Sequence, residues 1–182
     1  SVTRDDLPDG GAGQFVACIE AIRQVSPGTT VEVLAPDFGG DEVALTAVLE
    51  AGPEVFNHNI ETVPRLYSVV RPEAKYQRSL GVLHKAAQYG SIITKSGIML
   101  GLGEAEAEVI QVLQDWAENG VQAITIGQYL QPSPEHLEIV DYIHPEQFKK
   151  YEQIGYAMGY RQVVSGPLVR SSYHAAMLLN KD

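Results

Sequence analysis

The segment NHNIET at residues 57–62 places an amide and a carboxylate, Asn59 and Glu61, two positions apart. A carboxylate accepts hydrogen bonds and an amide both donates and accepts them, so the two together can bind adjacent hydroxyl groups. The pair therefore indicates recognition of a vicinal diol, such as that of a ribose. The alternative is an ordinary loop whose polar groups bond within the chain. His58 is expected to be a hydrogen-bonded histidine rather than a metal ligand.

The segment GIMLGLGE at residues 97–104 reads as a strand, a glycine-rich turn and the start of a helix. Gly101 and Gly103 would let the backbone approach a ligand closely, and the helix that starts at Glu104 would favour polar or negative groups at its N-terminus. A tight strand-to-helix turn without a ligand accounts for the pattern equally well.

A second glycine-containing segment, DDLPDGGA at residues 5–12, offers the backbone amides of Gly10 and Gly11 beside the carboxylate of Asp9. Such a turn can bind a carboxylate through its amides and an ammonium group through its acid. An ordinary Pro-Asp-Gly-Gly turn is the alternative, and it is favoured if the segment is taken alone.

Lys95 lies within a predicted strand. A buried strand lysine can form a Schiff base, so an aldolase that needs no cofactor is one hypothesis, and an ion pair inside a barrel is the alternative. Metal binding by the usual ligand sets is not indicated, because the five histidines lack ligand spacing and one cysteine cannot hold zinc or an iron–sulfur cluster. That residue, Cys18, is expected to be packed in a helix beside Val16 and Ile19.

The segments around these residues alternate between helical and strand patterns. Apolar residues recur at helical spacing in some of them, and β-branched residues dominate others. Predicted helices cover residues 13–25, 40–52, 76–90, 104–120 and 144–159, and predicted strands cover 29–36, 53–59, 91–100, 121–127 and 160–166.

This alternation predicts a parallel sheet with right-handed crossovers, in an α/β barrel or partial barrel. Polar residues follow three of the strands, at 57–59, 101–104 and 127–131. Ligands of parallel α/β proteins lie at the carboxyl ends of the strands, so these residues are expected to line the site. No internal domain boundary is indicated.

The composition excludes several classes of protein. The formal net charge of −10 argues against a nucleic-acid surface, and no apolar run is long enough to cross a membrane. A single cysteine suits a reducing compartment, so we expect a cytoplasmic bacterial protein, with an organelle as the alternative. The chain opens on what reads as the end of a strand running into a loop, so we expect a fragment.

Taken together and in this order, NHNIETV, GIMLGLGE, TIGQYLQPS and SGPLVRSSYHA resemble lipoyl synthases, which are radical S-adenosylmethionine (SAM) enzymes. Biotin synthase shares a similar NHN motif, whereas RDDLPDGGA and RSSYHA favour lipoyl synthase. The resemblance covers residues 1–176. It implies a partial (β/α)6 barrel of the radical SAM type, here truncated at the N-terminus, in a single domain of residues 1–182 with a C-terminal extension over about 144–182.

The resemblance also implies chemistry and partners. Radical SAM chemistry would insert two sulfurs at C6 and C8 of an octanoyl group on a lipoyl carrier domain, either a 2-oxoacid dehydrogenase E2 component or the glycine cleavage H protein. The intact enzyme would use SAM, two 4Fe–4S clusters and an electron donor such as ferredoxin or flavodoxin. Arg65, Arg71, Lys75 and Arg78 are a candidate docking face for the carrier, with solvated surface as the alternative.

By the same resemblance, the methionine end of SAM falls at Asp9, Gly10 and Gly11, and the ribose falls at Asn59 and Glu61. The adenine falls at Gly101, Gly103 and Glu104 and at the backbone near Gln128, Tyr129 and Leu130. Ser172 corresponds to the serine that ligates the auxiliary cluster.

The chain departs from the family pattern in one respect: the two cysteine triads that hold the clusters are not in it. The isolated chain is therefore expected to hold neither cluster. A non-catalytic remnant that only binds a carrier domain or another chain is a further alternative.

Overall fold

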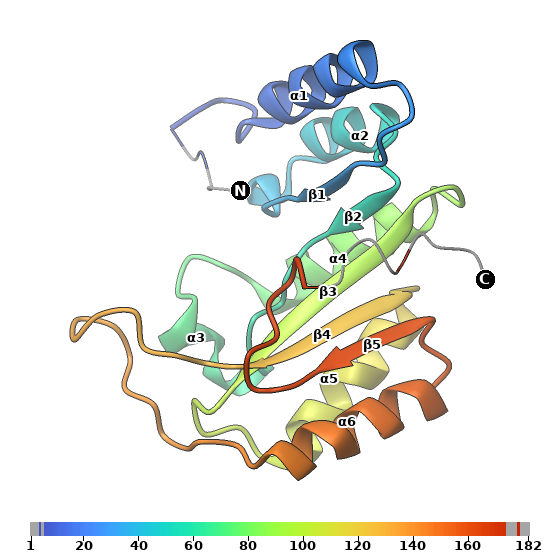
Figure 1. Cartoon of the computed structure of the whole chain (residues 1–182). Helices are drawn as coiled ribbons and strands as arrows, with labels where there is room; N and C mark the ends of the chain where they lie inside the picture. The colour runs from blue at the N-terminus through green and yellow to red at the C-terminus, as the bar shows by residue number, and fades with distance from the viewer. Residues whose placement is uncertain (1–3, 5, 174–177, 179–182) are drawn as a thin grey trace.

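The computed structural model describes residues 4, 6–173 and 178, and their central feature is a five-stranded parallel sheet. The strands follow one another across the sheet in chain order, each paired in parallel with the next. They are β1 (Glu32–Leu34), β2 (Val55–Asn57), β3 (Ile93–Leu100), β4 (Ala123–Gln128) and β5 (Gln162–Ser165). The predicted parallel α/β architecture is therefore confirmed. The sheet is open, with β1 and β5 at its edges. It forms part of the wall of a barrel and does not close into a complete barrel (Figure 1).

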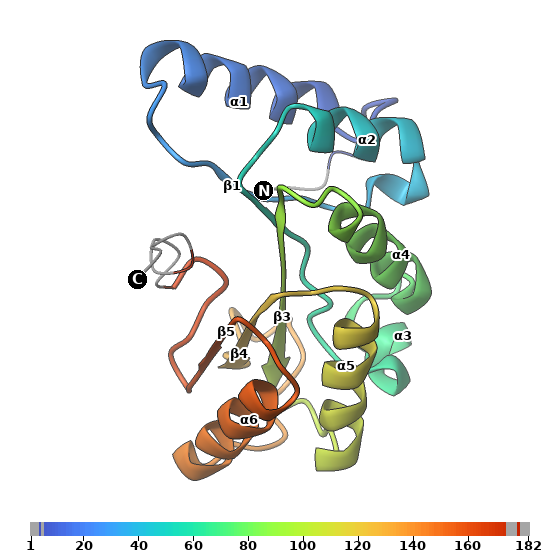
Figure 2. The same ribbon diagram turned by 90° about the vertical axis from the view of Figure 1, so that its right-hand side faces the viewer.

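Helices cover one face of this sheet, as Figures 1 and 2 show. The five predicted helices are present as α1 (Ala12–Val25), α2 (Glu42–Glu50), α4 (Tyr76–Ala87), α5 (Glu106–Glu118) and α6 (Pro145–Ala157). Three short elements were not predicted: the 3₁₀ turns η1 (Phe38–Gly40) and η2 (Pro64–Leu66), and the single-turn helix α3 (Tyr67–Val70).

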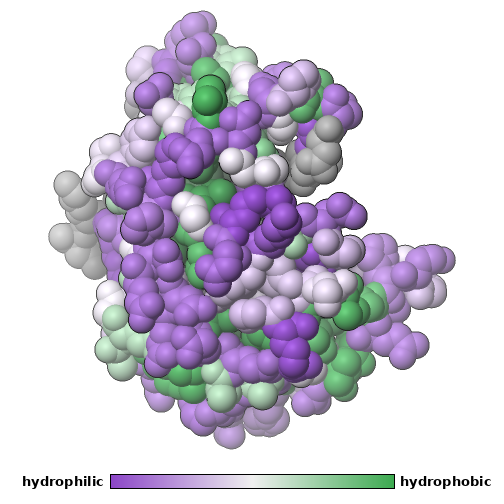
Figure 3. Space-filling view, turned by 180° about the vertical axis from the view of Figure 1, so that it is seen from behind, coloured by the Kyte–Doolittle hydropathy of each residue, from purple (hydrophilic) through white to green (hydrophobic). Residues whose placement is uncertain are grey.

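The core lies between the sheet and these helices. One cluster joins β3 and β4 to α4, α5 and α6 around Trp116 and Phe148, both fully buried, and a second joins α1 and α2 to β1 around Ile19 and Leu49. The outer surface of the helix-covered side is mainly hydrophilic (Figure 3). Among the described residues, no helix is both long and apolar enough to cross a membrane.

The prediction that Cys18 is a packed thiol is wrong, because its side chain is exposed. It lies on the same helix as Ile19, which is buried. Successive residues of an α-helix are rotated by about 100°, so burying Ile19 turns Cys18 towards solvent.

The opposite face of the sheet is crossed by the chain that follows β5 (Figures 1 and 2). Gly127 permits this crossing, since a Cβ on it would lie 2.4 Å from the carbonyl oxygen of Val169. Residue Leu178 packs on this face against Val55 and Ile93. Within the predicted C-terminal extension of about 144–182, residues 145–165 contain α6 and β5, and β5 pairs with β4 in the sheet.

Candidate functional site

A pocket of about 650 Å³ lies at the carboxyl ends of β1 and β2, where the architecture predicts a ligand. Its wall comes from three places: the end of β1 with η1, the turn after β2, and the segment that leads into α4. The lining residues are Leu34, Ala35, Pro36, Asp37, Gly39, His58, Asn59, Glu61, Arg71, Pro72, Glu73, Ala74 and Arg78. Of the residues predicted to bind SAM, Asn59 and Glu61 line this pocket and the others lie outside it.

The turn that carries Asn59 and Glu61 is fixed on one side by β3. The amides of Ile60 and Glu61 both donate to the carbonyl oxygen of Gly97, at 3.1 and 3.0 Å, and Met99 donates to the carbonyl oxygen of Glu61 at 2.9 Å. Glu61 has a φ of 69°, in the left-handed region. For a residue other than glycine this conformation costs about 1–3 kcal/mol and is concentrated at functional sites.

The polar groups of this turn fit a diol. The side-chain oxygen of Asn59 is buried and makes no hydrogen bond among the described residues. Burial raises the pKa of the Glu61 carboxyl, against the opposing effects of the Asn59 amide and the Arg71 charge. A carboxylate and an amide are the kinds of group that bind two ribose hydroxyls.

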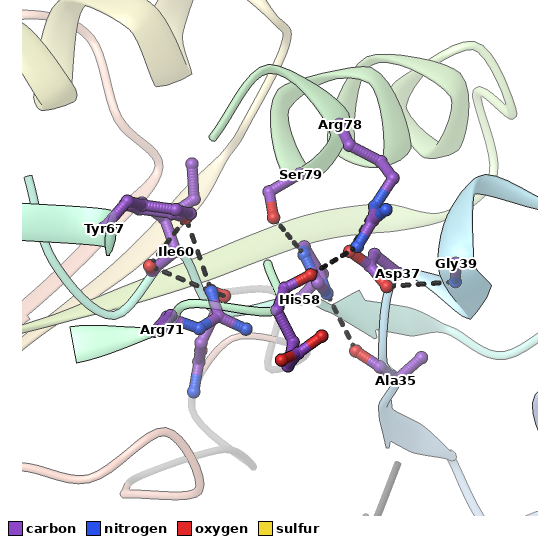
Figure 4. Close-up of polar contacts among 11 residues, drawn as sticks. Ala35, Asp37, Gly39, His58, Ile60, Tyr67, Arg71, Arg78 and Ser79 are labelled. Carbon is purple, nitrogen blue, oxygen red and sulfur yellow. Dashed lines mark hydrogen bonds and ion pairs between the residues drawn. The ribbon is translucent and has the colours of Figure 1, made fainter. Parts of the chain in front are cut away.

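Arg71 and Tyr67 fix the other side of the same turn (Figure 4). Nη1 of Arg71 donates to the carbonyl oxygens of Asn59 and Ile60, both at 3.0 Å, and to the Tyr67 hydroxyl at 3.3 Å. The Tyr67 hydroxyl itself donates to the Ile60 carbonyl at 2.8 Å, and the guanidinium lies 5.6 Å from the centre of the Tyr67 ring.

His58 anchors the floor of the pocket as a hydrogen-bonded histidine, as predicted. Its Nδ1 lies 2.9 Å from the carbonyl oxygen of Ala35, and its Nε2 lies 2.9 Å from the Ser79 hydroxyl (Figure 4). Burial lowers the pKa of the imidazole to about 4, so the ring is neutral at pH 7. It therefore ties the end of β1 to α4 without carrying charge.

The arginines of the candidate docking face are engaged within the chain. Nε of Arg78 lies 2.6 Å from a carboxylate oxygen of Asp37 at the pocket rim, and Arg65 forms a two-pronged pair with Glu108. Together with the bonds of Arg71, these contacts engage all three arginine guanidinium groups within the chain. Lys75 is exposed.

The turn at Asp9–Gly11 is closed by its own carboxylate. Asp9 accepts hydrogen bonds from the amides of Gly11 and Gly13, at 3.0 and 2.7 Å, at the start of α1, and these bonds lower the pKa of its carboxyl group. Gly10 packs against η1, since a Cβ on it would lie 3.2 Å from the Phe38 ring. The predicted methionine-binding turn therefore lies behind the η1 wall of the pocket, with its acid engaged in helix capping.

The two segments predicted to hold adenine lie against each other, but their polar groups are engaged within the chain. Glu104 accepts hydrogen bonds from the amides of Gly101 and Leu102, at 2.9 and 3.1 Å. Gln128 bonds the loop of residues 129–143, donating to the carbonyl oxygen of Asp141 at 3.1 Å and accepting from the amide of Ile143 at 3.0 Å.

Four further residues complete this rim. A Cβ on Gly101 would lie 2.2 Å from the Gln128 amide nitrogen, so glycine is required there. Gly103 is exposed, Tyr129 is buried and donates through its hydroxyl to the Leu137 carbonyl, and the side chain of Leu130 is partly exposed.

Ser172, the predicted cluster ligand, is exposed in a turn that the amide of Tyr173 closes by bonding to the Arg170 carbonyl at 2.9 Å. The neighbouring His174 and Ala175 of the motif lie outside the described residues. Within residues 4, 6–173 and 178, no three His, Cys, Asp or Glu side chains are arranged to hold a metal ion. These residues do not form a 4Fe–4S site by themselves.

Lys95 matches the ion-pair alternative rather than the aldolase hypothesis. Its Nζ lies 2.9 Å from a carboxylate oxygen of Glu32, and its side chain is 2% exposed. The same oxygen accepts a hydrogen bond from the Asn57 amide at 3.2 Å. A paired ammonium has no free electron pair for attack on a carbonyl.

The comparisons with known proteins identify the family of the chain. Residues 1–115 match the model of the Radical SAM superfamily, so the chain belongs to that superfamily. Within it, the chain is similar to lipoyl synthases. It is 59% identical over 176 residues to the lipoyl synthase of Caldanaerobacter subterraneus subsp. tengcongensis, covering 96% of the chain and 62% of that relative.

A second lipoyl synthase, from Rubrobacter xylanophilus, is 56% identical over 176 residues, covering 96% of the chain and 55% of the relative. The resemblance read from the motifs is thereby confirmed, and the chain spans little more than half the length of these relatives. The crystal structure of a methylornithine synthase is similar in fold, with a TM-score of 0.65 at 14% identity, covering 93% of this chain and 58% of the other. The predicted barrel fold of the radical SAM type is confirmed by the superfamily match and this likeness in fold together.

Proposed function

We propose that this chain is the SAM-binding part of a lipoyl synthase. The similarity to lipoyl synthases over 96% of the chain, at 59% identity, carries the proposal. The pocket at the carboxyl ends of β1 and β2, with a carboxylate and an unpartnered amide oxygen at its wall, supports it. Because the chain spans only 62% of that relative, we assign the complete reaction to a protein of the relatives' length.

In this proposal Asn59 and Glu61 bind the two ribose hydroxyls of SAM. The methionine end is assigned to the Asp9–Gly11 turn, and the adenine to the contact between the Gly101–Glu104 turn and residues 128–130. For SAM to bind at these two turns, Asp9 and Glu104 would each give up a hydrogen bond within their own turn and form one to the ligand instead. The neutral His58 and the Arg71 contacts keep the ribose pair in place during this exchange.

SAM bound together with a reduced 4Fe–4S cluster would supply the removal of one hydrogen atom each from C6 and C8 of an octanoyl group, with one SAM consumed per hydrogen, and an auxiliary cluster would supply the two sulfurs. The chain's own contribution is to bind and orient SAM and to exclude water. Ser172 is proposed as the auxiliary-cluster ligand, since it follows the segment that crosses the open face of the sheet. The octanoyl group is proposed to arrive on a lipoyl carrier domain, and electrons from a ferredoxin or flavodoxin.

A product assay tests this function. The protein, extended to the length of its relatives and reconstituted with iron and sulfide, is incubated with SAM, a reductant and an octanoylated carrier domain, and the lipoyl product is measured by mass spectrometry. We expect the wild type to form the lipoyl product. Glu61→Gln should bind SAM about tenfold to a hundredfold more weakly, because a hydrogen bond to a charged group is removed. Glu20→Gln, in the exposed outer face of α1, is the matched control. Sulfur insertion into dethiobiotin in place of octanoyl groups would contradict the proposal.

A further inference from the structure

Arg71 makes an unusual set of contacts for a residue that lines a ligand pocket. Its Nη1 reaches the carbonyl oxygens of Asn59 and Ile60 and the Tyr67 hydroxyl, and the guanidinium lies over the Tyr67 ring. Figure 4 shows the side chain extending from its own segment towards Ile60 and Tyr67. These bonds hold backbone rather than another charged side chain.

The backbone that Arg71 holds is the turn that presents the diol-binding pair. On the sheet side, the turn is fixed by the Gly97 carbonyl and the Met99 amide. On the outer side, Arg71 and Tyr67 bind the carbonyls of Asn59 and Ile60. Because Glu61 has a positive φ, its conformation has to be imposed by contacts on both sides.

The chemistry of arginine suits this task. A planar guanidinium directs its N–H groups in fixed directions and stacks on an aromatic ring, whereas the lysine ammonium is a compact charge on a flexible stem. Lysine at this position would keep the positive charge near Glu61 but would lose the planar group that lies over the Tyr67 ring and holds Nη1 at the two carbonyls. Charge and geometry can therefore be separated by one substitution.

From these contacts we propose that Arg71 is a positioning residue, which fixes the turn that presents Asn59 and Glu61 to the ribose diol and acts without binding the nucleoside itself. This inference rests on the proposed function, because it takes the diol-binding role of the pair as given. It adds a residue that the sequence motif does not mark. Tyr67 is the second member of the same clamp.

The test is a titration with ligands that differ in one group each. 5′-Methylthioadenosine has the ribose diol and no amino-acid carboxylate, its 2′,3′-dideoxy analogue lacks the diol, and S-adenosylhomocysteine has both the diol and the carboxylate. Their dissociation constants are measured by calorimetry for the wild-type chain, for Arg71→Lys and for the control Arg23→Lys. Arg23 likewise bonds two backbone carbonyls, those of Thr29 and Gly52, in a part of the molecule that does not line the pocket.

We expect Arg71→Lys to weaken methylthioadenosine and S-adenosylhomocysteine equally, by about tenfold, and the dideoxy analogue by less than about twofold. Arg23→Lys should leave all three dissociation constants unchanged. Equal losses for the diol and dideoxy ligands would overturn the inference, because Arg71 would then act on the pocket as a whole. A loss for S-adenosylhomocysteine alone would also overturn it, because Arg71 would then bind the carboxylate directly.

Failure of the proposed function looks different. A wild-type chain that binds methylthioadenosine no better than the dideoxy analogue would show that Asn59 and Glu61 do not bind the diol, whatever Arg71 does. If Arg71→Lys does not fold, Tyr67→Phe replaces it. This variant keeps the ring and removes the 2.8 Å bond to the Ile60 carbonyl. It should show the same dependence on the diol with a smaller loss.

Discussion

Replacing Gly97 with alanine tests how closely the sheet and the ribose pair are fitted together. A Cβ at this position would lie 2.6 Å from the Thr125 hydroxyl oxygen and 2.8 Å from the side-chain oxygen of Asn59. Ordinary contact begins at 3.4 Å, so each neighbour would have to move by more than half an ångström. Thr125 is β-branched and restricted in χ1, so most of the movement falls on Asn59.

The expected cost follows from this displacement. Overpacking of a fitted interior destabilises by about 1–3 kcal/mol, and displacing Asn59 removes one hydrogen bond to a bound diol, worth about 0.5–1.5 kcal/mol. Gly97→Ala should therefore lower the free energy of unfolding by about 1–3 kcal/mol and weaken methylthioadenosine binding by about threefold to tenfold. Urea denaturation measures the first effect, and calorimetric titration measures the second.

Gly81 provides the matched control for this substitution. It lies in α4 on an exposed position, and a Cβ there would meet nothing within 4 Å. Gly81→Ala should raise the free energy of unfolding by up to about 1 kcal/mol, because alanine is the better helix former, and should leave ligand binding unchanged. A Gly97→Ala variant as stable as the wild type, with unchanged affinity for methylthioadenosine, would refute the close packing of Asn59 against β3.

Three further predictions concern other parts of the chain. Because His58 has a pKa of about 4 in the folded protein and about 6.5 when unfolded, the unfolded state binds more protons between these values. The free energy of unfolding should therefore rise by up to about 3 kcal/mol from pH 4 to pH 6.5 and then level off; a pH profile in urea that is the same in His58→Gln would contradict this. Lys95→Met should lower the free energy of unfolding by about 3 kcal/mol, because it leaves the Glu32 carboxylate with one hydrogen bond. The double variant Lys95→Met, Glu32→Gln should recover most of this loss, and additive losses would exclude coupling between the two residues. Anaerobic reconstitution of the isolated chain should give no stoichiometric 4Fe–4S cluster, because Cys18 is its only cysteine, and iron counting near four per chain would contradict this expectation.

The regular elements could be predicted from the sequence because their patterns are long and strong. The strand predicted at 91–100 is β3 at 93–100, and the helix predicted at 104–120 is α5 at 106–118. Their ends differ by at most two residues, and the ends are where helix and strand patterns carry little information. The short elements η1, η2 and α3 were missed, because three or four residues are too few to show a period.

The site was predicted only in part, for a different physical reason. Asn59 and Glu61 were predicted from two side-chain types at a fixed spacing that suit a diol, and both residues line the pocket. The role of Arg71 is absent from such patterns, since it binds backbone carbonyls that every residue possesses. The engagement of Glu104 and Asp9 within their own turns likewise depends on local backbone geometry, which the glycine spacing did not specify. The prediction that Cys18 is packed was wrong because Cys18 lies outside the buried face of α1, to which Ile19 belongs.

The measurement that tests the central claim most directly is a crystal structure of the chain with 5′-methylthioadenosine. We predict that the ribose lies in the pocket at the carboxyl ends of β1 and β2, with its 2′ and 3′ hydroxyls within hydrogen-bonding distance of Asn59 and Glu61. A nucleoside bound in another part of the molecule, or in this pocket with its ribose turned away from both side chains, would contradict the account.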